Sequence, residues 1–141
     1  GESEETIRDT KDWLLANKPD DFDATLITVY NATPYSDFSR PHTSIPNAWT
    51  FTAPRTGDQL HFYETDFLTD ASYYKGIPGE YRSSVFTDAL SCEDLVRLRD
   101  DLENEVRRKL QIPFYPVTPS TRFEASMGMT PAHIMRSSKG A

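Results

Sequence analysis

The chain has 141 residues, which fits one domain of ordinary size, and its formal net charge is −7 at pH 7. Aromatic residues make up 12% of it and ten prolines interrupt it, so we expect a modest, aromatic-weighted core with much extended chain around it. The longest uncharged stretch is about 14 residues, against the ~20 that a membrane span needs, and the acidic start lacks the features of a signal peptide. Because Cys92 is the single cysteine, no intramolecular disulfide is expected. These features predict a soluble protein of a reducing or cytoplasmic compartment.

The charges are unevenly distributed along the chain. Residues 1–23 carry eight acidic and three basic side chains, whereas residues 107–141 carry six basic side chains and one acidic one. An acidic protein repels nucleic acid and anionic membranes, so neither partner is expected, except that the basic C-terminal segment could touch nucleic acid locally. The simplest interpretation is that the two ends neutralise each other, within one chain or between copies.

The N-terminal segment, residues 3–17, is predicted to be a helix. Ser3 or Thr6 can cap it, acidic residues occupy its first turn, and Pro19 ends it. Its apolar residues form a narrow stripe, which favours a helix on the surface or packed against a partner. They are Ile7, Trp13, Leu14 and Leu15.

Residues 24–30 are rich in β-branched side chains, uncharged and bounded by turn residues, a pattern that predicts a strand. Both faces of that strand would carry apolar side chains, which favours a central position in a sheet. Residues 31–47 contain Pro34, Pro41 and Pro46, so regular pairing is not expected over most of this stretch.

Residues 48–53 and 59–66 are predicted to form a β-hairpin around the turn at 54–58. One face should be buried and the other wet, because four apolar residues alternate with polar ones. The four are Trp49, Phe51, Leu60 and Phe62. Residues 67–78 are expected to be a loop and residues 80–87 a fourth strand.

Residues 92–110 give the strongest helix prediction. Ser91 can cap the helix, acidic residues occupy its first turn and basic residues its last. An apolar stripe at helical spacing consists of Leu95, Leu98, Leu102, Val106 and Leu110. The pairs with favourable i,i+4 charge are Glu93–Arg97, Glu103–Arg107 and Glu105–Lys109. The predicted fold class is α+β: an antiparallel sheet of about four strands covered on one face by this long amphipathic helix.

The remaining residues predict an extended, proline-rich C-terminal arm. We expect residues 1–110 to form a single α+β domain and residues 111–141 to form the arm, with a short terminal helix at 132–137 after Thr130 and Pro131. Phe114, Tyr115 and Phe123 lie on the arm and must be buried, against this domain or against a neighbouring chain.

His42 lies in the tetrapeptide His42-Thr43-Ser44-Ile45. This tetrapeptide resembles one half of the paired motif of 2H phosphoesterases, in which two such motifs each supply a histidine and a hydroxyl. Here the motif lies between prolines and no second copy follows, since His61 and His133 have other neighbours. His42, Ser44 and His61 are therefore the candidate catalytic residues of an alternative hypothesis, and a capping loop histidine is the simpler interpretation of His42.

Other chemistry finds less support in the sequence. His61, Glu64 and Asp66 share a predicted strand but not one face of it, so no metal site is expected. Cys92 lies at a helix N-terminus, but the neighbouring acids Glu93 and Asp94 oppose thiolate formation. No glycine-rich phosphate loop occurs, and no cofactor is expected.

Aromatic and basic side chains gather in two places that suit partner or ligand contact. The predicted contact residues are Tyr73, Tyr74, Lys75, Tyr81, Arg82, Phe114, Tyr115 and Phe123. With no recognisable catalytic site, the sequence favours a non-catalytic interaction or assembly protein within a larger complex, such as a virion-type or multi-subunit component, an inhibitor or an immunity-type binder. A protein partner or self-association is expected. The alternatives are a small hydrolase using His42, and a nucleotide or small-ligand binder using the Tyr73–Lys75 loop.

Overall fold

The fold is seen in a computed structural model, which describes residues 1–66 and 82–113. The helices are α1 (Glu4–Asn17), α2 (Pro34–Asp37) and α3 (Cys92–Leu110), and the strands are β1 (Arg40–Pro41), β2 (Ala48–Thr52), β3 (Gln59–Tyr63) and β4 (Val85–Phe86). The four strands form an antiparallel sheet in the order β1-β2-β3-β4, and α3 packs against it. The predicted α+β fold is confirmed. The predicted arm beyond Pro113, including its terminal helix, lies outside the described residues, as does the predicted loop at 67–78.

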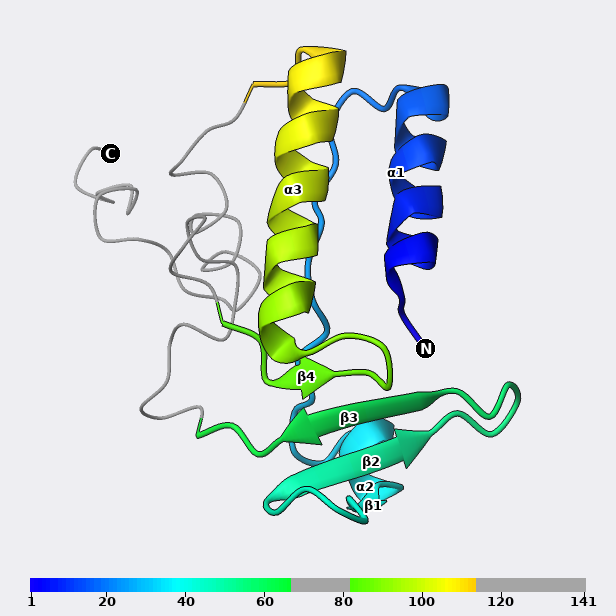
Figure 1. Ribbon diagram of the computed structural model, residues 1–141, viewed down its shortest axis with the longest axis vertical. Coiled ribbons are helices and arrows are strands. Elements are labelled where there is room, and N and C mark those ends of the chain that lie inside the picture. Colours follow the sequence, from blue (N-terminus) through cyan, green and yellow to red (C-terminus); the bar gives the residue numbers. More distant parts are fainter. Residues whose placement is uncertain (67–81, 114–141) are drawn as a thin grey trace, which may run out of the picture.

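The two long helices stand side by side on one side of the sheet, and both run away from it (Figure 1). Each begins with a capping box: Ser3 with Thr6 on α1, and Ser91 with Asp94 on α3. These reciprocal bonds satisfy backbone N–H groups that the first helical turn leaves without an intrahelical partner. Both helices therefore begin and end close to the predicted positions.

The hairpin prediction is confirmed, with shorter strands than expected. Trp49 pairs with Phe62 and Phe51 with Leu60, so the four predicted apolar residues share one face. The predicted strand at 80–87 is represented by Val85 and Phe86, within the part of that range that the structure describes. The proline-rich stretch 31–47 is more regular than expected, since it contains α2 and the two-residue edge strand β1, where Pro41 is tolerated.

The strand predicted at 24–30 is wrong. These residues belong to neither the sheet nor a helix; they run back toward the sheet beside α3, as Figure 1 shows. Two guanidinium groups of α3 hold the chain here, one through a main-chain oxygen of this segment and one through a main-chain oxygen just before it. Arg99 Nε donates to the Ala24 oxygen at 2.7 Å, and Arg107 Nη2 donates to the Phe22 oxygen at 2.6 Å. We call residues 24–29 the return segment.

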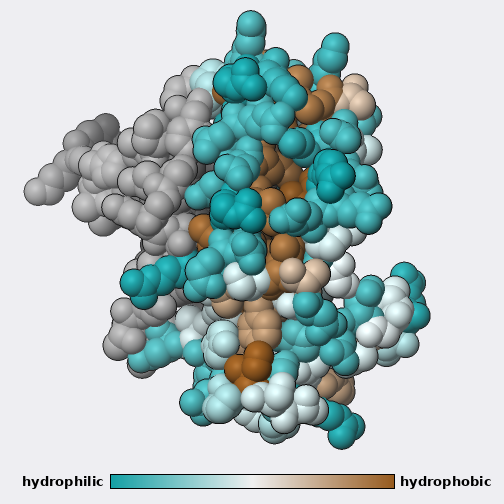
Figure 2. All heavy atoms as spheres, in the orientation of Figure 1, coloured by the Kyte–Doolittle hydropathy of each residue, from teal (hydrophilic) through white to brown (hydrophobic). Residues whose placement is uncertain are grey.

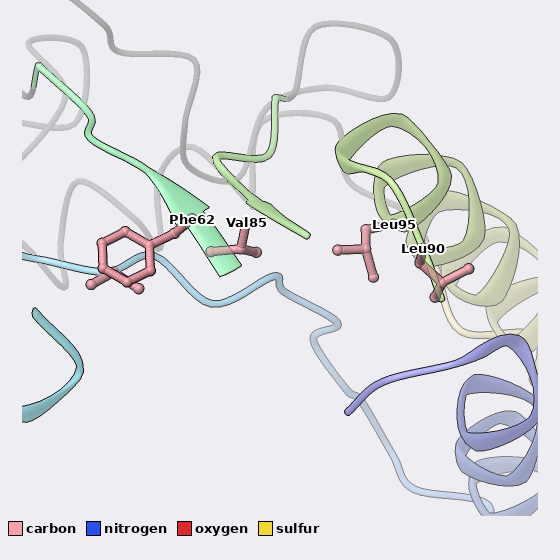
Figure 3. Close-up of a cluster of buried hydrophobic side chains, with 5 residues drawn as sticks. Phe62, Val85, Leu90 and Leu95 are labelled. Atoms are coloured by element: carbon pink, nitrogen blue, oxygen red, sulfur yellow. The ribbon is translucent and has the colours of Figure 1, made fainter. Parts of the chain in front are cut away.

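The core has two parts joined by the helices. Val29, Phe62, Val85, Leu90 and Leu95 form the cluster between sheet and α3; Figure 3 shows Phe62 on β3, Val85 on β4, Leu95 on α3 and Leu90 just before α3. Leu14, Leu102 and Val106 form the second cluster, between α1 and α3. Ile7 packs against both clusters, so α1 is held to the sheet through the same apolar core.

Candidate functional site

The structure brings two of the candidate histidines together. His42 follows β1 and His61 lies on β3, and their ring centroids are 4.8 Å apart in an edge-on arrangement. Phe86 of β4 stacks on His61 with centroids 5.0 Å apart. These rings share the sheet face opposite the apolar core, because His61 pairs with Thr50 on one side and with Phe86 on the other.

His61 is buried, with 3% of its surface exposed, so the prediction that this sheet face is wet is wrong at this position. Its Nε2 lies 3.0 Å from Asp88 Oδ1, and its Nδ1 lies 2.9 Å from Thr50 Oγ1. A carboxylate only accepts hydrogen bonds, so Nε2 carries a proton; in the neutral ring Nδ1 then accepts from the Thr50 hydroxyl. Both ring nitrogens are satisfied, which makes burial of the imidazole tolerable.

The other candidate residues of the His42 motif do not join this chain of hydrogen bonds. His42 Nδ1 accepts from the backbone N–H groups of Ser44 and Ile45 at 3.1 and 3.0 Å. This is the geometry of a histidine that caps a turn. Ser44 is exposed. Its contact with His42 is made by the main chain, so the hydroxyl role proposed for Ser44 finds no counterpart here.

The sequence did not identify Thr50 and Asp88 as residues of this site. The signal for Thr50 was present, because the register of the predicted hairpin places it opposite His61. No sequence signal pointed to Asp88, which is 27 residues from His61 and enters through the turn after β4.

Cys92 is half-buried at the start of α3. Burial raises the pKa of its thiol, and the neighbouring Glu93 carboxylate raises it further. The thiol is therefore more fully protonated at neutral pH than a free cysteine, the opposite of an activated nucleophile.

Most of the predicted contact residues lie outside the described residues. They are Tyr73, Tyr74, Lys75, Tyr81, Phe114, Tyr115 and Phe123. Arg82 is described and exposed, just before β4. Across residues 1–66 and 82–113, no group of three or more histidine, cysteine, aspartate or glutamate side chains is arranged to hold a metal ion.

A groove of about 620 Å³ runs between α1 and α3. Its apolar floor includes Ile7, Leu98 and Leu102. Figure 2 shows this floor as a hydrophobic strip between the two helices, bordered by hydrophilic residues. The charged residues around it carry both signs; they are Glu4, Arg8, Lys11, Asp101, Glu105 and Arg108. An apolar centre with a polar rim is the general composition of a protein–protein interface.

Large apolar side chains are also exposed outside the groove. Trp13 on α1 is 62% exposed, Phe38 after α2 is 74% exposed and Ile27 in the return segment is 41% exposed. Single exposed apolar residues are ordinary in proteins, so these three by themselves do not define a contact surface.

The return segment is held by a buried ionic cluster on α3. Glu103, with 4% of its side chain exposed, lies 3.0 Å from Arg107 Nε and 3.3 Å from Arg99 Nη2. Arg107 also reaches Asp21 at 3.1 Å, so acidic and basic segments neutralise each other within one chain at this point. Arg99 and Glu103 lie on the same helix face as the apolar stripe, a spacing that could have identified them as buried.

Comparison of the chain with protein families, with curated proteins and with solved structures finds no match. Among the described helices, none is both long and apolar enough to cross a membrane.

Proposed function

We propose that this protein is a non-catalytic interaction or assembly protein that works as a component of a larger protein complex. The observation that carries this proposal is the groove between α1 and α3, whose apolar floor lies open between two helices that are otherwise well packed. An apolar face of a helix pair gains stability when another chain covers it, at roughly 25 cal/mol for each Å² of apolar surface removed from water.

The charges around the groove favour a protein partner with mixed charge. Lys11 and Glu105 bridge the two helices at 2.8 Å, while Asp101 and Arg108 are exposed on the rim. Rim charges of both signs contribute mainly to partner choice and association rate, whereas the apolar floor contributes affinity.

The test is the native mass of the full chain by size exclusion with light scattering, over a range of concentrations, at low and high salt. An assembly protein is expected to exceed the monomer mass of 16.1 kDa as concentration rises. Persistence of the assembly in high salt would assign it to apolar burial, and dissociation in salt would assign it to the rim charges. A monomer at every concentration and salt would contradict self-assembly.

A second candidate function is hydrolysis, and one observation favours it. Asp88, His61 and Thr50 form a continuous carboxylate–imidazole–hydroxyl chain, with His42 against its central ring. In such an arrangement the imidazole can accept the hydroxyl proton at Nδ1 as the Thr50 oxygen attacks the carbon or phosphorus of an ester, and can return that proton to the alcohol that leaves as its ester bond breaks. Water then releases the group held on Thr50.

The hydrolysis proposal is tested with two model substrates, p-nitrophenyl acetate and bis(p-nitrophenyl) phosphate. If it holds, Thr50→Val and His42→Ala lose turnover while circular dichroism shows that they remain folded. Ser44→Ala, whose hydroxyl is not in the chain, serves as the matched control. Turnover that is absent from the wild type, or equal in all variants, contradicts it.

A further inference from the structure

The return segment has a backbone without a hydrogen-bonding ladder. Within the described residues, residues 24–29 make no backbone–backbone hydrogen bond. In this part of the described chain, the Ala24 oxygen accepts a hydrogen bond from Arg99. The other main-chain groups of residues 24–29 have no hydrogen-bond partner among the described residues. A row of such N–H and C=O groups is a template on which another strand can pair.

The side chains of the return segment already suit a strand. Thr25, Ile27, Thr28 and Val29 are β-branched, and none of residues 24–29 is charged, proline or glycine. Thr25 and Ile27 are exposed while Leu26 is half-buried, so burial alternates along the segment in the period of a strand. Natural proteins protect exposed edges with charges or prolines, and this segment carries neither.

We infer that the return segment is the site at which two copies of this chain associate, by antiparallel pairing of residues 25–29 of one copy with residues 25–29 of the other. This inference rests on the proposed assembly function and names its partner as a second copy. One such pairing covers two open edges at once, because each copy contributes the same surface, as in a two-fold interface. A foreign strand would cover only one.

The charges at the ends of the return segment select the antiparallel direction. Asp20, Asp21 and Asp23 precede it, and Asp21 is paired with Arg107, whereas the uncharged residues 31–33 follow it. Parallel pairing would bring the acidic ends of the two copies together. Antiparallel pairing places each acidic end beside the uncharged end of the other copy.

Pairing centred on the exposed Ile27 places the two Ile27 side chains directly opposite each other across the dyad. This geometry has a specific consequence, because like charges directly opposite in neighbouring strands repel and opposite charges attract. In a dimer of one variant, the substituted side chain of each copy therefore faces the same substituted side chain of the other copy.

The experiment measures the dissociation constant of the full chain by analytical ultracentrifugation. Ile27→Lys alone and Ile27→Glu alone should each weaken association about tenfold or more, and an equimolar mixture of the two should recover it. Phe38→Lys, which also replaces an exposed apolar residue by lysine, is the matched control and should associate like the wild type. Hydrogen exchange of the wild type should show amides in residues 24–29 gaining protection as concentration rises.

The outcomes separate the two proposals. If the wild type associates but Ile27 variants and the Phe38 control behave alike, or if the mixture is no stronger than its parts, the pairing is overturned while the assembly function stands. A protein that stays monomeric at every concentration overturns both the pairing and the self-assembly on which it rests.

Discussion

The guanidinium of Arg99 on α3 donates a hydrogen bond to the main-chain oxygen of Ala24, 75 residues earlier in the chain, at a distance of 2.7 Å. Nε of the same side chain makes this bond, while Nη1 lies 2.6 Å from Asp100 and Nη2 lies 3.3 Å from Glu103. A buried charged side chain of α3 thus holds the main chain of a segment that is distant in the sequence. The guanidinium can do this because its donors point in several directions at once.

Replacing Arg99 should therefore cost more than an ordinary surface substitution. Arg99→Met removes one member of a buried ionic cluster and leaves Glu103 less well compensated, which is expected to lower the free energy of unfolding by about 3–5 kcal/mol. The measurement is urea unfolding followed by circular dichroism. Arg97→Met is the matched control, because Arg97 is exposed and its ion pairs are of the kind that contribute little. Equal losses for the two variants would contradict the role of Arg99.

Truncation of Leu95 should test whether the sheet and α3 share one core. Leu95 is buried beside Phe62 and Val85, so Leu95→Ala should lower the free energy of unfolding by about 2–5 kcal/mol through lost burial and the cavity left behind. Trp13→Ala, at an exposed position on α1, should change it far less. A single urea transition, seen at the same midpoint by tryptophan fluorescence and circular dichroism, is expected for both. Two separate transitions would show that helices and sheet unfold independently.

Glu105 on α3 pairs with Lys11 on α1 and with Lys109, and we call this contact the Glu105 clamp. It should make the stability of the protein depend on pH under acidic conditions. Hydrogen bonds from Lys109 and Lys11 lower the pKa of Glu105 from 4.5 to about 2. Because the folded-state pKa lies below the unfolded value, the stabilisation is fully present above pH 4.5 and is lost as the pH falls toward 2.

The Tm of Glu105→Gln should thus be lower than that of the wild type at pH 7, and the difference should shrink toward zero as the pH falls through about 2. Thermal melts at a series of pH values measure it. Asp12→Asn, an exposed acid of α1, controls for the general effect of removing a negative charge. A difference that is constant over the whole range would rule out the clamp as its source.

The thiol of Cys92 should react slowly in the native protein. Burial and Glu93 both raise its pKa, so alkylation by iodoacetamide at pH 8 should be much slower than alkylation of the same chain unfolded in urea. Mass spectrometry follows the added group over time. Native and unfolded rates that are the same would show an accessible, unperturbed thiol.

Elements with a strong local pattern were predictable. The span from Cys92 to Leu110 has a capping serine, acidic and basic ends and an apolar stripe in helical register, so its helical state could be predicted from local residues alone. The hairpin follows from alternation on both sides of a glycine-containing turn, where Gly57 adopts a φ of 78° that other residues rarely take.

The candidate site was predictable in part. His42 and His61 could be singled out as chemistry-bearing residues, but their proximity depends on β1 pairing beside β2 and β2 beside β3. The burial of His61 depends on neighbours from distant parts of the chain, and Asp88 reaches it only after β4 has joined the sheet. None of these contacts has a local signature.

The sequence by itself determined that the segments of α1 and α3 are helical and where the hairpin turns, because these properties depend on neighbours a few positions away. Only the tertiary structure decided the state of residues 24–30. Their composition favours a strand, but a strand needs a second strand to pair with. The described sheet consists of β1 to β4 and does not include these residues. Arg99 and Arg107 on α3 instead donate hydrogen bonds to the main-chain oxygens of Ala24 and Phe22. Strand formation is a property of two segments, so the composition of one cannot settle it.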